Sequence, residues 1–92
     1  MVSKRGLPDL SARQLVVLLL IAGHKDMRVE ATSVRRLSEK MKVHKPAVTR
    51  AFDRLVDLGL IVRKKHSHDG RIVEAVITNA GTAFVQALQN AA

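Results

Sequence analysis

The residues with the clearest chemistry in this 92-residue chain are cations, which gather in the middle of the sequence. Guanidinium and ammonium groups bind phosphates, and a guanidinium can also donate two hydrogen bonds to the edge of a guanine. The formal net charge is +8, and residues 33–71 contain eleven Lys/Arg against four acidic residues. Seven of the eight net charges therefore lie in that segment, which predicts a polyanionic partner, nucleic acid before an anionic membrane surface.

Residues 45–58 are predicted to form a helix with one apolar and one polar face. Val48, Phe52 and Leu55 recur at the spacing of one helical face, and Pro46 suits a first turn, whose N–H groups have no partner inside the helix. The polar face is then free to enter the major groove of duplex DNA, where the N-terminal half of the helix reads base edges. The predicted reading residues are His44, Lys45, Pro46, Ala47, Thr49, Arg50 and Arg54.

Arg50 and Thr49 carry the most specific predictions on this face. Arg50 can contact O6 and N7 of a guanine, which discriminates against a wrong base by about 1–3 kcal/mol. Thr49 offers a small side chain that can meet a thymine methyl group. Two alternatives stay open: the face could be an ordinary solvated surface, and Arg54 could instead pair with Asp53 or Asp57.

Residues 60–65 and 71–78 are predicted to be two strands rich in Ile and Val, joined by a loop with Asp-Gly turn chemistry. Strand alternation makes Lys64 and Lys65 face opposite ways, so only a subset of the cations in residues 63–72 can follow one phosphate track. Those contacts would give affinity and salt dependence without sequence choice, whereas Arg71 could sense a narrow minor groove. The alternative is a hairpin whose charges serve solubility. The predicted contacts are Lys64, Lys65, His66, His68 and Arg71.

The two histidines of this loop could also suggest a metal site together with Asp69. No third well-placed ligand accompanies them, so we expect no metal and no cofactor. Beside phosphate, His66 and His68 would become partly protonated, which predicts tighter binding at mildly acidic pH.

Two further helices are predicted before the basic segment. Ser11 and Gln14 have the spacing of a capping box, and they precede the apolar residues 15–22. Such a helix is either buried in the core or packed against a second copy of the chain. A short strand is expected at residues 28–31, and Thr32 or Ser33 can cap the next helix. Since helix N-termini attract phosphate, its predicted contacts are Ser33, Arg35 and Arg36, of which only one arginine is expected to reach DNA.

With a last helix capped by Thr78 or Asn79, the elements give the order α-β-α-α-β-β-α. This order is a winged helix-turn-helix, an α+β and mostly helical fold, and we expect residues 1–92 to form a single such domain.

From Ser11 to Leu88 the chain resembles the MarR (multiple antibiotic resistance regulator) family of bacterial repressors. The segments that carry the resemblance are VHKPAVTRAFDRLVDLGLI, DGR and ITNAG. The resemblance implies that Arg71 reaches the minor groove with Asp69 orienting it. It also implies that the helix in the major groove presents Lys45, Ala47, Thr49, Arg50 and Arg54. Proteins of this family are usually longer at both ends, where extra helices build the dimer, so a dimer of this chain is expected to use different surfaces.

Other function classes have little support in the sequence. The chain has no cysteine, no glycine-rich phosphate loop and no Ser/His/Asp arrangement, so we expect no enzyme. No apolar run approaches the ~20 residues that span a bilayer, and we expect a cytoplasmic protein at the nucleoid. With only two aromatic residues, duplex DNA is favoured over single strands. The predicted function is a sequence-specific, homodimeric transcriptional regulator. The alternatives are a sequence-tolerant nucleoid- or plasmid-associated protein that coats DNA, and a protein-interaction module.

Overall fold

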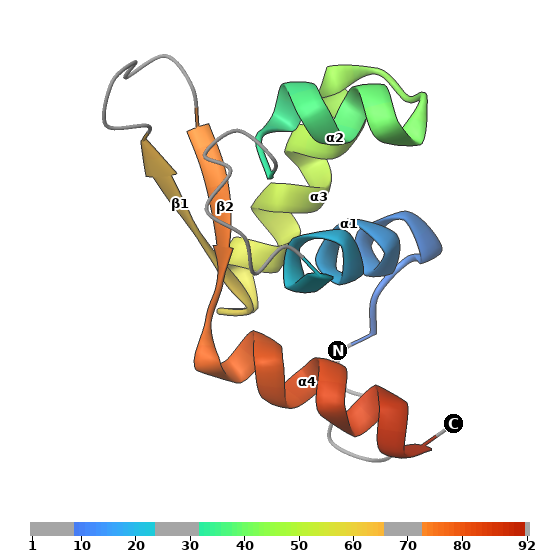
Figure 1. The fold of residues 1–92 in the computed structure, drawn as a ribbon, viewed down its shortest axis with the longest axis vertical. Helices are drawn as coiled ribbons and strands as arrows, with labels where there is room; N and C mark the ends of the chain where they lie inside the picture. The colour runs from blue at the N-terminus through green and yellow to red at the C-terminus, as the bar shows by residue number, and fades with distance from the viewer. Residues whose placement is uncertain (1–8, 24–31, 66–72, 92) are drawn as a thin grey trace.

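Four helices and one hairpin make up the fold (Figure 1), which a computed structural model describes for residues 9–23, 32–65 and 73–91. The elements are α1 (Ala12–Gly23), α2 (Val34–Met41), α3 (Lys45–Asp57), β1 (Ile61–Lys65), β2 (Val73–Ile77) and α4 (Asn79–Ala91). This order confirms the predicted winged helix-turn-helix. The strand expected at residues 28–31 and the loop at residues 66–72 lie outside the described residues.

The predicted capping box begins α1. The amide of Gln14 donates to Ser11 Oγ at 3.1 Å, and the amide of Ser11 donates to Gln14 Oε1 at 3.0 Å. Two N–H groups that would lack a helical partner are thereby satisfied. The helix presents Val17, Leu18 and Ile21 to the core, so its apolar run is divided between a buried and an exposed side.

A tight turn joins α2 to α3. Lys42, the residue after α2, adopts a left-handed conformation with φ 58°, and the amide of Val43 donates to the Ser38 carbonyl at 3.1 Å. This geometry closes the C-terminus of α2 and reverses the chain within three residues. The helix-turn-helix predicted from the sequence is therefore present.

The hairpin is a two-stranded antiparallel sheet in which Ile61 pairs with Ile77 and Lys65 pairs with Val73. Its second strand is also tied to the residues before α2, because Ser33 forms an isolated bridge with Glu74 and the Ala75 amide donates to the Thr32 carbonyl at 3.2 Å. The hairpin is thus fixed to the start of the helix-turn-helix as well as to its end.

One apolar core joins these elements. Its buried members are Val17, Leu18, Ile21, Leu37, Val48, Ala51, Phe52, Leu55, Leu60, Ile61, Ala75 and Phe84. Phe52 is 0% exposed and is the largest fully buried side chain among the residues that the structure describes. In Figure 1, α2 and α4 lie at opposite ends of the long axis, and the free end of the hairpin points toward the α2 end. None of the helices in the described part of the chain has the length and hydropathy that crossing a bilayer requires.

Candidate nucleic-acid interface

The start of α3 is open to solvent. His44 precedes the helix in an extended conformation, and the Ala47 amide donates to its carbonyl at 3.0 Å. Pro46 occupies the first turn without removing a helical hydrogen bond, because N–H groups there have no partner within the helix. His44, Lys45 and Pro46 are all exposed, so this end of α3 is accessible.

α3 is divided lengthwise into a buried and an exposed face. Thr49 and Arg50 are exposed, whereas Val48 and Phe52 are fully buried. Ala47 and Arg54 are half-buried, since they lie where the two faces meet. The N-terminal exposed face therefore has Lys45, Thr49 and Arg50 at its centre, with Ala47 and Arg54 at its edge.

The cations of α3 are available for a ligand. Among the residues that the structure describes, neither Arg50 nor Arg54 forms an ion pair, so the alternative pairing of Arg54 with Asp53 or Asp57 is not adopted. A free guanidinium on an exposed helix face can move to meet a base edge or a phosphate.

At the start of α2, one predicted contact has a structural role. Ser33 is only 4% exposed, and its Oγ accepts a hydrogen bond from the Arg36 amide at 3.1 Å, which caps the helix. Arg35 and Arg36 are exposed and both reach Glu39, at 3.6 Å and 4.0 Å. Pairs this exposed contribute little to stability, so Arg35 can exchange Glu39 for a phosphate.

The register of the hairpin separates its cations onto two faces. Lys65 lies on the same face as Arg63 and as Ala75, which is buried. Lys64 lies on the other face, opposite Glu74. The expectation that the two lysines diverge is confirmed. The predicted contacts His66, His68 and Arg71 lie outside the described residues.

Arg63 has a contact that the sequence did not suggest. Its guanidinium pairs with the carboxylate of Asp53 on α3, ten residues earlier in the chain. Asp53 follows Thr49 by four residues and Arg50 by three, so it shares their exposed face. The strand alternation that places Lys64 and Lys65 on opposite faces also puts Arg63 on the inner face of β1. The sequence therefore indicated the face on which Arg63 lies, but not its partner.

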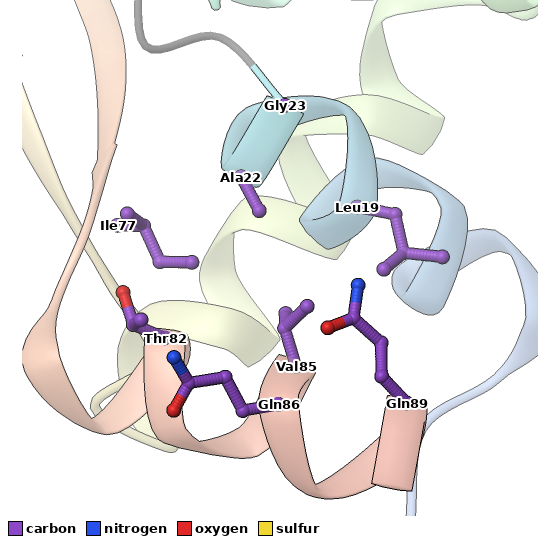
Figure 2. Close-up of a pocket in the computed structure, with 8 residues that line it drawn as sticks. All are labelled: Leu19, Ala22, Gly23, Ile77, Thr82, Val85, Gln86 and Gln89. Atoms are coloured by element: carbon purple, nitrogen blue, oxygen red, sulfur yellow. The ribbon is translucent and has the colours of Figure 1, made fainter. Parts of the chain in front are cut away.

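A cleft lies away from these cations, between α1 and α4 (Figure 2). It encloses about 440 Å³, and in Figure 2 Val85 and Gln89 of α4 point toward Leu19 of α1. Its lining residues are Leu19, Ala22, Gly23, Ile77, Thr82, Val85, Gln86 and Gln89. The lining mixes apolar and amide side chains and includes no charged residue.

Within residues 9–23, 32–65 and 73–91, no three His, Cys, Asp or Glu side chains lie together in a way that could hold a metal ion.

Comparisons with known proteins agree with this geometry. The family model described as the MarR family matches residues 8–72. An uncharacterized HTH-type transcriptional regulator of Mycobacterium leprae is 31% identical over 81 residues, covering 88% of this chain and 53% of that protein.

Solved structures of similar fold include the YusO protein of Bacillus subtilis, with 28% identity and a TM-score of 0.72 over 84% of this chain and 51% of that one. MepR of S. aureus in complex with DNA has 20% identity and a TM-score of 0.76 over 88% of this chain and 58% of that one. The chain thus spans about half the length of the relatives that it matches.

Proposed function

The chain belongs to the MarR family, and from that premise we propose that it is a sequence-specific transcriptional regulator that binds duplex DNA as a homodimer. The observation that carries the proposal is the two-sided α3: its apolar face is fixed in the core, while Thr49 and Arg50 are exposed beside a cationic hairpin. MepR, a protein of the same fold, binds DNA in its solved complex, which supports a similar use of this surface.

In this proposal α3 enters the major groove with its N-terminal half foremost. Arg50 contacts a guanine edge, and the small side chains of Ala47 and Thr49 allow the helix to approach thymine methyl groups. His44, Lys45, Pro46 and Arg54 complete the contacts around this centre. The half-buried position of Arg54 suits a phosphate at the edge of the groove better than a base at its centre.

Phosphate contacts come from both sides of α3. Arg35 or Arg36 supplies one at the start of α2, where capping by Ser33 holds the helix end. The hairpin supplies the others, and the proposed residues are Lys64, Lys65, His66, His68 and Arg71. These contacts fix the position of the protein on the duplex but do not choose a sequence.

We propose that residues 1–92 act as one DNA-binding domain with no catalytic step, in the cytoplasm at the nucleoid. Support for the single domain is the shared core, to which α1, α2, α3, the hairpin and α4 all contribute buried residues.

The second protomer is proposed to pack on α1 and α4. Val16 and Leu19 of α1 are each 43% exposed, and Leu19 lines the cleft together with Val85 of α4. Covering these side chains would remove apolar surface from water and place two α3 helices on one duplex. The surface lies toward the α4 end of the molecule, so it does not compete with DNA (Figure 1).

Selection of bound duplexes from a random pool, followed by competition against random duplex, tests the proposal. We expect the selected sequence to bind at least a thousand-fold more tightly, as specific regulators do (~10³–10⁷). A ratio near one would instead indicate a protein that coats DNA without sequence choice. Full activity of Arg50→Ala and Arg71→Ala variants would indicate a protein-interaction module.

A further inference from the structure

The ion pair between Arg63 and Asp53 is the one described side-chain link between the hairpin and the exposed face of α3. The two elements are joined at their base by residues 58–60, where the Leu60 amide donates to the Leu55 carbonyl at 2.9 Å. From that base they separate toward the α2 end (Figure 1). The backbone bonds of β2 to residues 32–33 hold the hairpin on its other side, so a side-chain link between β1 and α3 can adjust the angle between these two elements.

The position of Arg63 in the hairpin couples it to the cations nearer the free end. Lys65 lies two residues further on the same face, a distance of about 7 Å along a strand. If β1 changes its direction at Arg63, Lys65 therefore moves relative to Arg50 on α3. The register leaves Lys64 on the other face, opposite Glu74.

Asp53 is an unexpected residue for a surface that meets DNA. It lies on the same helical face as Thr49 and Arg50, where an unpaired carboxylate would repel phosphate. Its side chain is 59% exposed, so burial in the core does not explain it. Pairing with Arg63 neutralises the carboxylate, which reduces its repulsion of phosphate and links α3 to the hairpin.

We propose that Arg63 is a positioning residue that, through Asp53, sets the angle of the hairpin beside α3 so that base contacts and phosphate contacts form together. This inference rests on the proposed function, since it concerns how selected DNA is recognised. Arg63 acts through Asp53, and its own contact with phosphate is not required.

An alternative role for Arg63, direct contact with phosphate, predicts the opposite effect of one substitution. If Arg63 only neutralises phosphate, Asp53→Asn releases it and removes a repulsive charge, so selected duplex binds more tightly. If the pair sets the hairpin angle, Asp53→Asn weakens binding to selected duplex by about five-fold or more, the scale of coupled contacts. Random duplex should bind more tightly in both cases.

The matched control is Asp57→Asn. Asp57 is also exposed on α3 and forms no ion pair among the described residues. Its substitution therefore changes the net charge by the same amount as Asp53→Asn without breaking a link. We expect this variant to bind selected and random duplexes more tightly by the same small factor. Thermal unfolding of Asp53→Asn should stay within about 4 °C of the wild type, because exposed pairs add little stability.

The experiment measures Kd for selected and random duplexes with the wild type, Asp53→Asn, Arg63→Gln, the double variant and Asp57→Asn. The two single substitutions break the same ion pair. The proposal therefore predicts that the double variant binds selected duplex no more weakly than whichever single variant has the higher Kd. Additive losses, or a gain for Asp53→Asn on selected duplex, would overturn it. A wild-type ratio near one would remove the proposed function itself, whereas a high wild-type ratio unchanged in Asp53→Asn removes only this inference.

Discussion

Arg50 is the residue on which sequence choice most depends in the proposed complex. It is exposed on the first half of α3 and forms no ion pair within the described residues, so its guanidinium can donate two hydrogen bonds to a guanine. We predict that Arg50→Ala costs about 1–3 kcal/mol on the selected duplex and relaxes the preference at one base pair. Repeating duplex selection with the variant measures both effects.

Arg35→Ala is the matched comparison, because it removes the same charge at the start of α2. A phosphate contact should weaken all duplexes equally and lower the slope of log affinity against log salt by about 0.9. Equal losses from the two variants on selected and random duplexes would contradict a base-reading role for Arg50.

The exposed residues of α3 could be predicted from the sequence, whereas the contact of Arg63 could not. The spacing of Val48, Phe52 and Leu55 fixes which side of the helix is buried, and the opposite side follows. The partner of Asp53 depends instead on the angle between α3 and β1, a tertiary property. The sequence offered Arg54 as a neighbour of Asp53, but the structure places Arg63 there.

At the scale of elements, the close approach of α4 to the start of β1 requires glycine at position 81. A Cβ atom there would overlap the carbonyl oxygen of Leu60 and come within 2.7 Å of Ile77 Cγ1. We predict that Gly81→Ala lowers the free energy of unfolding by about 1–3 kcal/mol, the usual cost of overpacking. Denaturant titration measures the change.

Gly23→Ala is the control for that substitution, since no heavy atom lies within 4 Å of a Cβ built at Gly23. Alanine favours helix by up to about 1 kcal/mol over glycine, so stability should stay the same or rise. Similar losses of unfolding free energy in both variants would show that the lack of space around Gly81 is not what destabilises Gly81→Ala.

Thr78 links α4 to the end of α3 through its hydroxyl. Thr78 Oγ1 accepts from the Gly81 amide at 3.0 Å and donates to the Gly59 carbonyl at 2.6 Å. We predict that Thr78→Val, which keeps the shape but removes both bonds, costs about 1–2 kcal/mol of unfolding free energy. Thr82 of α4 is exposed, so Thr82→Val is the control and should change stability by less than about 0.5 kcal/mol. A neutral Thr78→Val would contradict the capping role.

Element boundaries followed local chemistry closely enough to be predicted. The capping box lies at Ser11 and Gln14, where the sequence placed it, and of the two predicted caps of α2, Thr32 or Ser33, it is Ser33 that caps the helix. The division of α1 into two sides could not be predicted, because eight consecutive apolar residues carry no period. Packing against α3 and α4 decides which of them are buried.

For the whole molecule, a cationic surface and an uncharged cleft lie apart along the long axis. The cations predicted to contact DNA gather on α2, α3 and the hairpin, while the cleft between α1 and α4 has no charged lining residue. In Figure 1, α2 and α4 lie at opposite ends. In the proposed function, the surface for DNA and the surface for a second protomer are therefore separate, and both can be occupied at the same time.

This arrangement leads to a prediction about assembly. Leu19, 43% exposed on α1, lines the cleft, so Leu19→Glu should place a charge in the proposed dimer contact and halve the mass in solution. Val62→Glu is the control, because Val62 is 49% exposed on the hairpin, away from the cleft. Light scattering at matched concentrations measures both masses. A dimer that survives Leu19→Glu, or that is lost equally in Val62→Glu, would place the contact elsewhere.

Loss of the dimer should also weaken binding to a two-site duplex while leaving half-site binding unchanged, since each α3 reads its own half-site one helical turn, about 34 Å, from the other.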